Sequence, residues 1–169
     1  VRLILKRAGV SRFNKPRVVI CVPSAITPVE RRAVTEACRR AGASDAQLIE
    51  QPLAAAIGAN LPISEAFGSM VVDIGGGTSE TALLSLGGIV EIEAKRVGSF
   101  DIDDAIQNYI RREYGLAIGE RTAEEIKWTV GSAAETPGEG RAEVRGREMF
   151  TGMPKTVILQ PYEIRTAIE

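Results

Sequence analysis

The sequence predicts an α/β fold, and three observations support that prediction. Short β-branched runs alternate with segments of helical period, which is the pattern of βαβ units around a parallel sheet. An apolar run ends in Asp73 and is followed by three glycines at 75–77, as expected where a buried strand meets a tight turn. Two further short runs follow at hairpin spacing. A second, antiparallel sheet is therefore predicted beyond the βαβ part.

Composition narrows the class of protein. The 169 residues are 44% hydrophobic and 25% charged, enough to bury a core, and a net charge of −1 argues against a general nucleic-acid partner. The absence of histidine removes histidine acid–base chemistry and histidine metal ligands. Cys21 and Cys38 show no framework spacing, which favours a reduced, cytoplasmic protein. No apolar run reaches the roughly 18 residues of a membrane-spanning helix.

The first βαβ unit has clear boundaries in the sequence. The run at 17–22 is β-branched, which is typical of a buried strand. Thr27 and Glu30 form a capping box around Pro28, which suits the first helical position, and Gly42 fits the end of that helix. Apolar residues share one helical face. Because acids alternate with the arginines on the rest of the helix, we predict a solvated face there rather than a binding patch.

Glu50 closes the second strand of this unit. The segment 46–50 is apolar until that residue, and Pro52 then opens a second helix. Ligands of open α/β sheets bind at the carboxyl ends of parallel strands, so Glu50 is a candidate for polarising a water molecule. The alternative is an acid at a helix entrance that backbone N–H groups satisfy.

The glycine turn belongs to a predicted meander that starts after a loop at 61–69. Runs at 70–74, 78–86 and 89–97 follow one another, with Gly87-Gly88 as a two-residue hairpin signal. Three glycines lack Cβ atoms, so successive N–H groups in their turn can form a concavity for phosphate oxygens. An acid at its mouth, Asp73, suits a hydrated divalent cation. The sequence therefore predicts a phosphate-and-metal hairpin.

The last third of the chain is predicted to be a small α+β part. Its first helix follows 98–101 and carries Asp101, Asp103 and Asp104 in its first turn, where the macrodipole favours acids; a metal role is the alternative.

A second helix in this part starts at the capping box of Thr122 and Glu125. Strands are expected at 141–147 and 155–159, before a last helix that starts at Pro161. From the residues alone, Glu120 and Lys127 are surface charges or face a ligand across this helix start.

The loop at 9–15 also has two interpretations. Phe13 lies among cations there, so it is either a surface connection or an apolar anchor that meets anionic lipid.

Four motifs, in this order and spacing, go beyond these patterns. The segments at 22–33, 48–58, 71–80 and 118–127 together resemble the MreB family of bacterial actin homologues, which shape rod-like cells. The resemblance implies part of the actin-like ATPase (ribonuclease H-like) fold. It implies the C-terminal part of a first subdomain at 1–68, the start of a second at 69–115, and a small α+β subdomain with a truncated return helix at 116–169.

The resemblance also implies roles for individual residues. Asp73 matches the acid that positions hydrated Mg²⁺, and Glu50 matches the glutamate that orients the attacking water. Phe13 matches an apolar loop that inserts into the membrane, although Asn14 follows it where the family usually has a second apolar residue. Gly75, Gly76, Gly77 and Thr78 match the positions that wrap the β- and γ-phosphates of ATP. Glu120 and Lys127 match positions that approach the ribose and adenine.

The implied function is a cytoplasmic, membrane-associated ATPase that hydrolyses ATP as it polymerises. Its partners would be further copies of itself, the inner membrane surface and cell-wall elongation proteins. The family's first phosphate loop and adenine-clamping segment are not in this sequence, so we expect an internal piece of a longer protein that alone binds ATP weakly or not at all.

The alternatives are an Hsp70-type nucleotide domain, a sugar or acetate kinase, and a fragment that only folds or assembles. The glycine hairpin alone would suit the first two. A kinase needs polar insertions between the sheet elements, and the short connections here favour a polymer.

Overall fold

The computed structural model of the chain describes residues 1–9, 15–134 and 140–169. These residues form two compact units, Val1–Arg96 and Val97–Glu169. No helix within the described ranges is long and apolar enough to cross a membrane. The subdomain boundaries expected after residues 68 and 115 stay a prediction.

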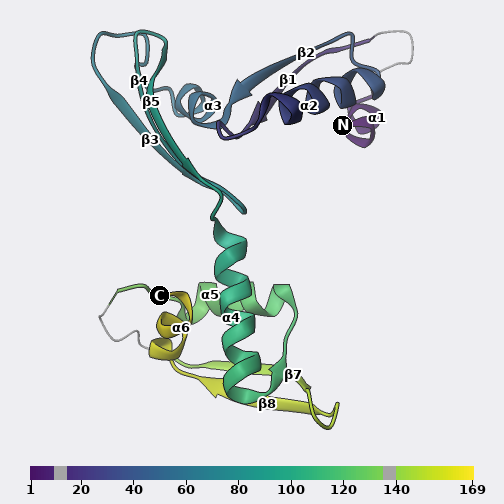
Figure 1. Ribbon diagram of the computed structural model, residues 1–169, viewed down its shortest axis with the longest axis vertical. Coiled ribbons are helices and arrows are strands. Elements are labelled where there is room, and N and C mark those ends of the chain that lie inside the picture. Colours follow the sequence, from purple (N-terminus) through teal and green to yellow (C-terminus); the bar gives the residue numbers. More distant parts are fainter. Residues whose placement is uncertain (10–14, 135–139) are drawn as a thin grey trace. The chain divides into compact units, whose positions relative to one another are not determined.

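The first unit begins with a βαβ arrangement. Strands β1 and β2 pair in parallel, from Arg17 opposite Asp45 to Val22 opposite Glu50, and α2 packs against β2 (Figure 1). This confirms the predicted parallel pair. The elements in chain order are α1 (Arg2–Arg7), β1 (Arg17–Val22), α2 (Pro28–Arg40), β2 (Asp45–Glu50) and α3 (Gln51–Gly58).

Local signals explain where α2 begins and ends. The Thr27 hydroxyl accepts a hydrogen bond from the Glu30 backbone N–H at 3.2 Å, and the Glu30 carboxylate accepts one from the Thr27 N–H at 2.7 Å. The predicted capping box is therefore confirmed. Gly42, just beyond the helix, has φ of +109°, which favours glycine. The predicted apolar face is only partly covered, since Cys38 is buried whereas Val29 is exposed.

The first unit continues into an antiparallel meander of three strands, in the order β3-β4-β5. Its strands are β3 (Ser69–Ile74), β4 (Ser79–Ser85) and β5 (Gly88–Lys95). Ala56 of α3 packs on Ala82 and Leu84 of β4, and all three are fully buried. Small side chains at the contact allow this helix to approach the sheet closely.

The turn between β4 and β5 differs by one residue from the prediction. Ser85 pairs with Gly88, so the two turn residues are Leu86 and Gly87 rather than Gly87 and Gly88. Their φ angles are +52° and +81°. Positive φ at both central positions is what a type I′ hairpin requires, because that turn matches the twist of the strands. Leu86 adopts this conformation although it has a Cβ.

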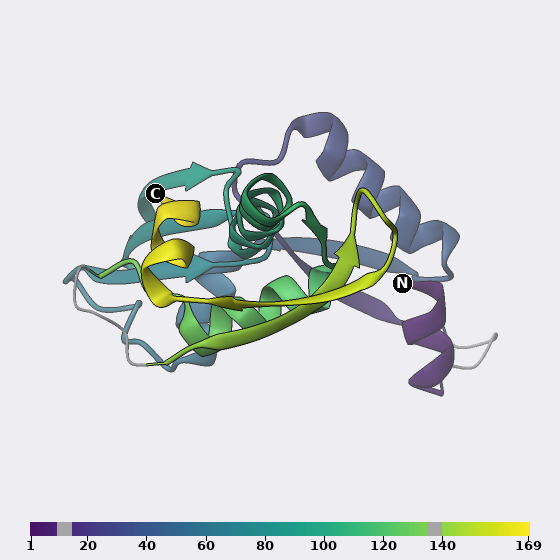
Figure 2. The same cartoon turned by 90° about the horizontal axis from the view of Figure 1, so that it is seen from below.

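The second unit packs three helices with a small antiparallel sheet of order β6-β7-β8. Figure 2 looks along α4 and shows α6 beside it, and α4 also packs on α5. The elements are α4 (Ser99–Tyr114), β6 (Leu116–Ala117), α5 (Glu120–Val130), β7 (Ala142–Glu148), β8 (Pro154–Leu159) and α6 (Pro161–Ile168). Fully buried core side chains are Ile106, Ile110, Leu116, Leu159 and Ile164.

A buried carboxylate joins α4 to α6. Glu163 accepts hydrogen bonds from the Tyr114 hydroxyl, from the Tyr109 hydroxyl at 3.4 Å and from the Gln160 backbone N–H at 2.8 Å. The hydrogen bond to Glu163 and burial both raise the pKa of Tyr114. Burial and the charge of Glu163 also raise the pKa of Tyr109, so both tyrosines stay protonated at neutral pH, and the Glu163 carboxylate has hydrogen-bond donors.

Candidate functional site

The glycine turn joins β3 to β4, as predicted. Ile74 and Ser79 pair at the ends of the two strands, and the Gly75 N–H donates to the Thr78 carbonyl at 2.8 Å. Among the described residues, no backbone hydrogen bond engages the N–H groups of Gly76 and Gly77. Side chains are absent at 75–77, so a ligand can approach the backbone donors of this turn.

Asp73 lies at the mouth of this turn, one residue before the end of β3. Its cross-strand partner on β4 is Glu80. Paired residues of an antiparallel ladder point to the same face, so two carboxylates stand side by side there. Asp73 is partly exposed, whereas Glu80 is only 2% exposed. Glu80 accepts hydrogen bonds from Ser24, at 2.7 Å from the backbone N–H and at 3.4 Å from the hydroxyl.

Sequence reasoning did not single out Glu80. The signal that was present is its alternation with Ala82 and Leu84, which places all three on the buried face of β4. A charged residue at a position whose period-two neighbours are core residues needs a partner. Its partner, Ser24, is 56 residues away in sequence, and no local pattern identifies it.

Glu50 occupies the last position of β2 and the N-cap position of α3. Its side chain makes no hydrogen bond to that helix. Instead its carboxylate lies 3.1 Å from the guanidinium of Arg31 on α2, with 31% of the glutamate and 39% of the arginine side chain exposed. The helix-entry alternative, a carboxylate satisfied by backbone N–H groups, is therefore not what the structure shows. The role of Glu50 toward water stays a prediction.

Lys127 and Glu120 both lie on α5, in the second unit. The Lys127 ammonium is 2.8 Å from the Asp103 carboxylate and donates to the Ser99 hydroxyl at 3.0 Å and to the Ser99 carbonyl at 3.2 Å. Only 15% of the Lys127 and 9% of the Asp103 side chain are exposed. Two hydrogen-bond acceptors on Ser99 and one ionic partner, Asp103, therefore surround the ammonium. Asp103 Oδ1 is buried and accepts no hydrogen bond of regular geometry, so its negative charge is compensated by the ion pair with Lys127.

The remaining residues predicted for a site are an acid at the start of α4, Glu120 and Phe13. Asp101 accepts a hydrogen bond from the Gly98 N–H at 2.7 Å, which supports the helix-start interpretation of that acid. Glu120 is the exposed first residue of α5. Within the described ranges, no group of three or more histidine, cysteine, aspartate or glutamate side chains is placed to hold a metal ion. Phe13 lies outside the described residues.

A small cavity of about 260 Å³ adjoins the glycine turn. Gly77 and Thr78 form one side, and the loop between β1 and α2 forms another through Pro23, Ala25 and Ile26. Glu30 and Arg96 complete the lining, with 3.4 Å between their charged groups. Hydrogen bonds from Thr27 lower the pKa of Glu30, so this carboxylate is ionised at neutral pH. The cavity is smaller than a typical pocket for a whole drug-sized ligand.

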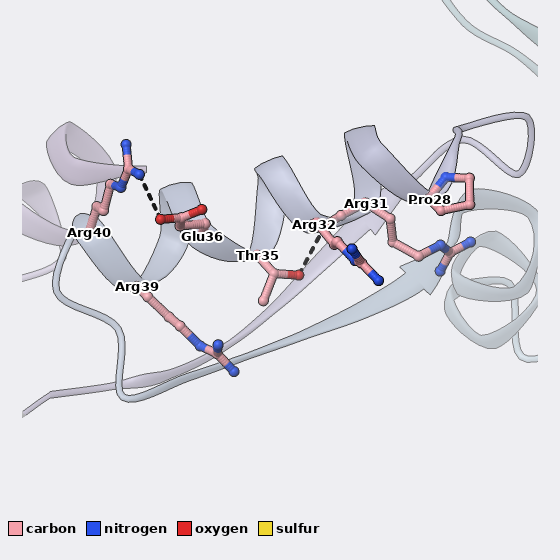
Figure 3. A pocket seen from close by; sticks show the side chains of 7 residues that line it. All are labelled: Pro28, Arg31, Arg32, Thr35, Glu36, Arg39 and Arg40. Carbon is pink, nitrogen blue, oxygen red and sulfur yellow. Dashed lines mark hydrogen bonds and ion pairs between the residues drawn. The ribbon is translucent and has the colours of Figure 1, made fainter.

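A larger open groove of about 770 Å³ runs along α2 and is lined by arginines (Figure 3). Arg40 pairs with Glu36 at 2.6 Å, and the Thr35 hydroxyl donates to the Arg31 carbonyl at 3.0 Å. The groove is lined by Pro28, Arg31, Arg32, Thr35, Glu36, Arg39 and Arg40. Long, mostly exposed side chains on one helix enclose such a groove without converging on a centre. The hairpin is therefore the stronger candidate site.

Comparisons with known proteins place the chain in a family. The family described as MreB/Mbl protein matches residues 1–169. The cell shape-determining protein MreB of Escherichia coli strain K12 is 53% identical over 154 residues, which is 91% of this chain and 44% of that protein. The cell shape-determining protein Mbl of Bacillus subtilis strain 168 is 43% identical over 156 residues, 92% of this chain and 47% of that protein.

A solved structure shows the same fold. MreB5 of Spiroplasma citri bound to AMPPNP superposes with a TM-score of 0.84 and 34% identity, covering 98% of this chain and 51% of that one. The predicted actin-like α/β fold is confirmed, and the chaperone and kinase alternatives are not favoured. The chain spans about half the length of the relatives it matches. The chain belongs to the MreB/Mbl protein family.

Proposed function

We propose that the protein carrying this chain is an ATP-binding cell-shape protein that forms filaments and hydrolyses ATP as it polymerises. The observation that carries the proposal is the glycine turn at 75–78, whose N–H groups at 76 and 77 have no backbone acceptor among the described residues. Such a turn suits phosphate oxygens. The matched relatives are named as cell shape-determining proteins, and the superposed structures hold AMPPNP or ADP.

Magnesium fits the donor set at this turn. Mg²⁺ prefers oxygen ligands, keeps several waters, and is usually held by one or two carboxylates together with substrate phosphates. Asp73 supplies a partly exposed carboxylate beside the turn, and would hold the ion through water. When bound, the ion would neutralise charge on the phosphate oxygens. The backbone N–H groups of Gly76 and Gly77 would hold those oxygens in place.

Glu50 is the proposed residue that orients the attacking water. Its carboxylate is partly exposed at the carboxyl end of β2 and is bound to Arg31 by an ion pair of the kind worth about 0–1 kcal/mol. Such a pair exchanges readily for a water molecule. Phosphoryl transfer depends on positioning and charge stabilisation more than on covalent help, so a chain without histidine is suited to it.

Lys127 and Glu120 are proposed to approach the ribose and adenine. The ammonium of Lys127 already has two acceptors on Ser99 and an ionic partner in Asp103, so contact with a nucleotide requires it to release one of these contacts. A contact to Ser99 is the cheaper one to release, because breaking the ion pair would leave the buried Asp103 carboxylate uncompensated.

The proposed partners are further copies of the same protein, the inner membrane surface and cell-wall elongation proteins. The family relation supports self-association into filaments. Membrane contact through the Phe13 loop rests on the sequence alone. We propose a cytoplasmic protein that associates with the membrane surface.

The hairpin assignment is tested by Asp73→Ala in the full-length protein. We expect the variant to lose about tenfold or more in MgATP affinity and most of the difference between affinities with and without magnesium, because the carboxylate that holds the hydrated ion is gone. Equilibrium titration with a fluorescent ATP analogue, with Mg²⁺ or with EDTA, measures both.

Asp104→Ala, which removes an exposed acid from α4, is the matched control and should titrate like the wild type. Equal affinity with and without magnesium in both the wild type and Asp73→Ala would refute the metal assignment.

A further inference from the structure

Glu80 is a buried acid for which the proposed function assigns no role. Burial of a carboxylate is costly unless hydrogen bonds compensate it. The hydrogen bonds found for Glu80 both come from Ser24, and the shorter, at 2.7 Å, comes from the backbone N–H. A hydrogen bond to an ionised acceptor is stronger than one between neutral groups. The contact therefore holds Ser24 firmly against β4.

Ser24 belongs to the loop that connects β1 to α2. The strand ends at Val22 and the helix starts at Pro28, so this loop sets where α2 begins. The shorter of the two contacts is made by the backbone of the loop and does not depend on the identity of the residue at 24, whereas the longer one uses the Ser24 hydroxyl. It joins two segments 56 residues apart in sequence.

The same loop faces the glycine turn across the small cavity of about 260 Å³. On the buried side of the cavity, Glu80 binds the loop through Ser24, and Glu80 itself lies on β4 only two residues beyond Thr78. On the exposed side, Arg96 and Glu30 are 3.4 Å apart with more than two-fifths of each side chain exposed. An exposed pair of this kind contributes little, so the buried contact dominates.

Glu80 is also the direct neighbour of Asp73. Cross-strand partners have Cβ atoms about 4.5–5.5 Å apart on one face of the sheet. The two Ser24 donors hold the Glu80 carboxylate on the side of the loop. A Glu80 side chain released from Ser24 would be free to turn toward Asp73, where a second negative charge would disturb a bound cation.

We propose that Glu80 is a positioning residue that fastens the β1–α2 loop to β4 and thereby sets Asp73 and the 75–78 turn for the phosphates and magnesium of a nucleotide. This inference rests on the proposed function of the hairpin. The same loop is also connected to Glu50, the other carboxylate predicted for the site. The loop leads into α2, and Arg31 of α2 forms an ion pair with Glu50. Glu80 is thereby linked to the position of Glu50 through α2 and its partly exposed ion pair from Arg31.

Hydrogen exchange in the full-length protein tests the first half of the inference. In the wild type, the backbone amide of Ser24 should be protected, and Glu80→Ala should raise exchange in a peptide spanning 20–27 by about tenfold or more, because a charge-assisted hydrogen bond is lost. Glu80→Gln keeps the shape and a neutral acceptor, so it should give a smaller increase. Glu93→Ala, at an exposed position of β5, is the matched control and should leave this peptide unchanged.

Nucleotide titration of the same variants tests the second half. Glu80→Ala should weaken MgATP binding by about tenfold and ATP binding in EDTA by less, with Glu80→Gln between it and the wild type. A merely structural residue would weaken both equally. Should Glu80→Ala fail to fold, Glu80→Gln carries the test alone, with the same order of effects.

Two results would overturn the inference while sparing the hairpin: unchanged exchange at 20–27 in both Glu80 variants, or faster exchange with wild-type MgATP affinity. In either case Asp73→Ala would still weaken magnesium-dependent binding. If Asp73→Ala also binds like the wild type, the proposed function itself fails, and the role of Glu80 falls with it.

Discussion

The carboxylates of Asp73, Glu80, Glu50 and Asp103 differ in how exposed they are and in which groups they contact. Asp73 is partly exposed beside backbone donors, Glu80 is buried against a backbone N–H, and Glu50 pairs with an arginine at the surface. Asp103 is compensated by an internal lysine. Only acids that stay accessible can meet a ligand directly, so Asp73 and Glu50 suit contact with nucleotide and water. Glu80 and Asp103 suit the support of neighbouring groups.

At this scale we predict that Glu50→Ala in the full-length protein keeps nucleotide affinity and loses about a hundredfold or more in ATP turnover, because the group that aligns the water is gone. Steady-state phosphate release and nucleotide titration separate the two effects. Arg31→Ala, which removes only the partner of Glu50, should change turnover much less. Turnover that is unchanged in Glu50→Ala would remove its catalytic role.

Several secondary-structure elements followed local sequence signals. The capping box predicted at Thr122 and Glu125 did not, because α5 begins at Glu120 after Gly119 and has no side-chain cap. The capping box of α2, the parallel strands on either side of it and the glycine turn after β3 were all predictable, because each depends on residues a few positions apart. The hairpin turn was predicted one residue too late. The adjacent glycines Gly87 and Gly88 suggested the turn, but the strand register places it at Leu86 and Gly87. Contacts set by register, such as Glu80 with Ser24, have no signature in a single sequence.

Gly146 of β7 lies so close to β6 that the small sheet has no room for a side chain at this position. A Cβ at this position would lie 2.6 Å from the Ala117 carbonyl oxygen of β6 and 2.8 Å from the Leu116 side chain. Gly146→Ala should therefore lower the free energy of unfolding by about 1–3 kcal/mol, because backbone atoms must move. Chemical denaturation followed by circular dichroism measures the loss.

Gly88→Ala is the control for this prediction, because a Cβ there meets no atom within 4 Å. Its midpoint should stay close to that of the wild type. Equal stability of both variants would mean that β6 and β7 do not approach this closely.

At the scale of the whole molecule, the chain contains two compact units and about half the length of its relatives. The fold and the family were predictable because four motifs occur in order and spacing across both units. The contacts of Lys127 were not predictable, since its partners Asp103 and Ser99 lie on another helix. The site proposed for the full-length protein therefore includes residues whose present partners are internal.

We predict that the 169-residue chain binds MgATP at least about tenfold more weakly than the full-length protein and neither hydrolyses it nor pellets, because the relatives are about twice as long. Parallel titration, phosphate release and sedimentation assays on the two proteins check this. A chain that hydrolyses ATP as fast as the full-length protein would show that these residues suffice for catalysis.

The ion pair of Lys127 with Asp103 has a consequence for how the chain responds to its ionic surroundings. Salt screens exposed charges over a Debye length that falls from about 10 Å at 0.1 M to about 3 Å at 1 M, whereas buried pairs are screened far less. The pairs on α2, Arg31 with Glu50 and Arg40 with Glu36, are open to solvent and will weaken as ionic strength rises. The junction of α4 with α5 will not. As ionic strength rises, the ion pair of Glu50 therefore weakens before the ion pair of Lys127 does.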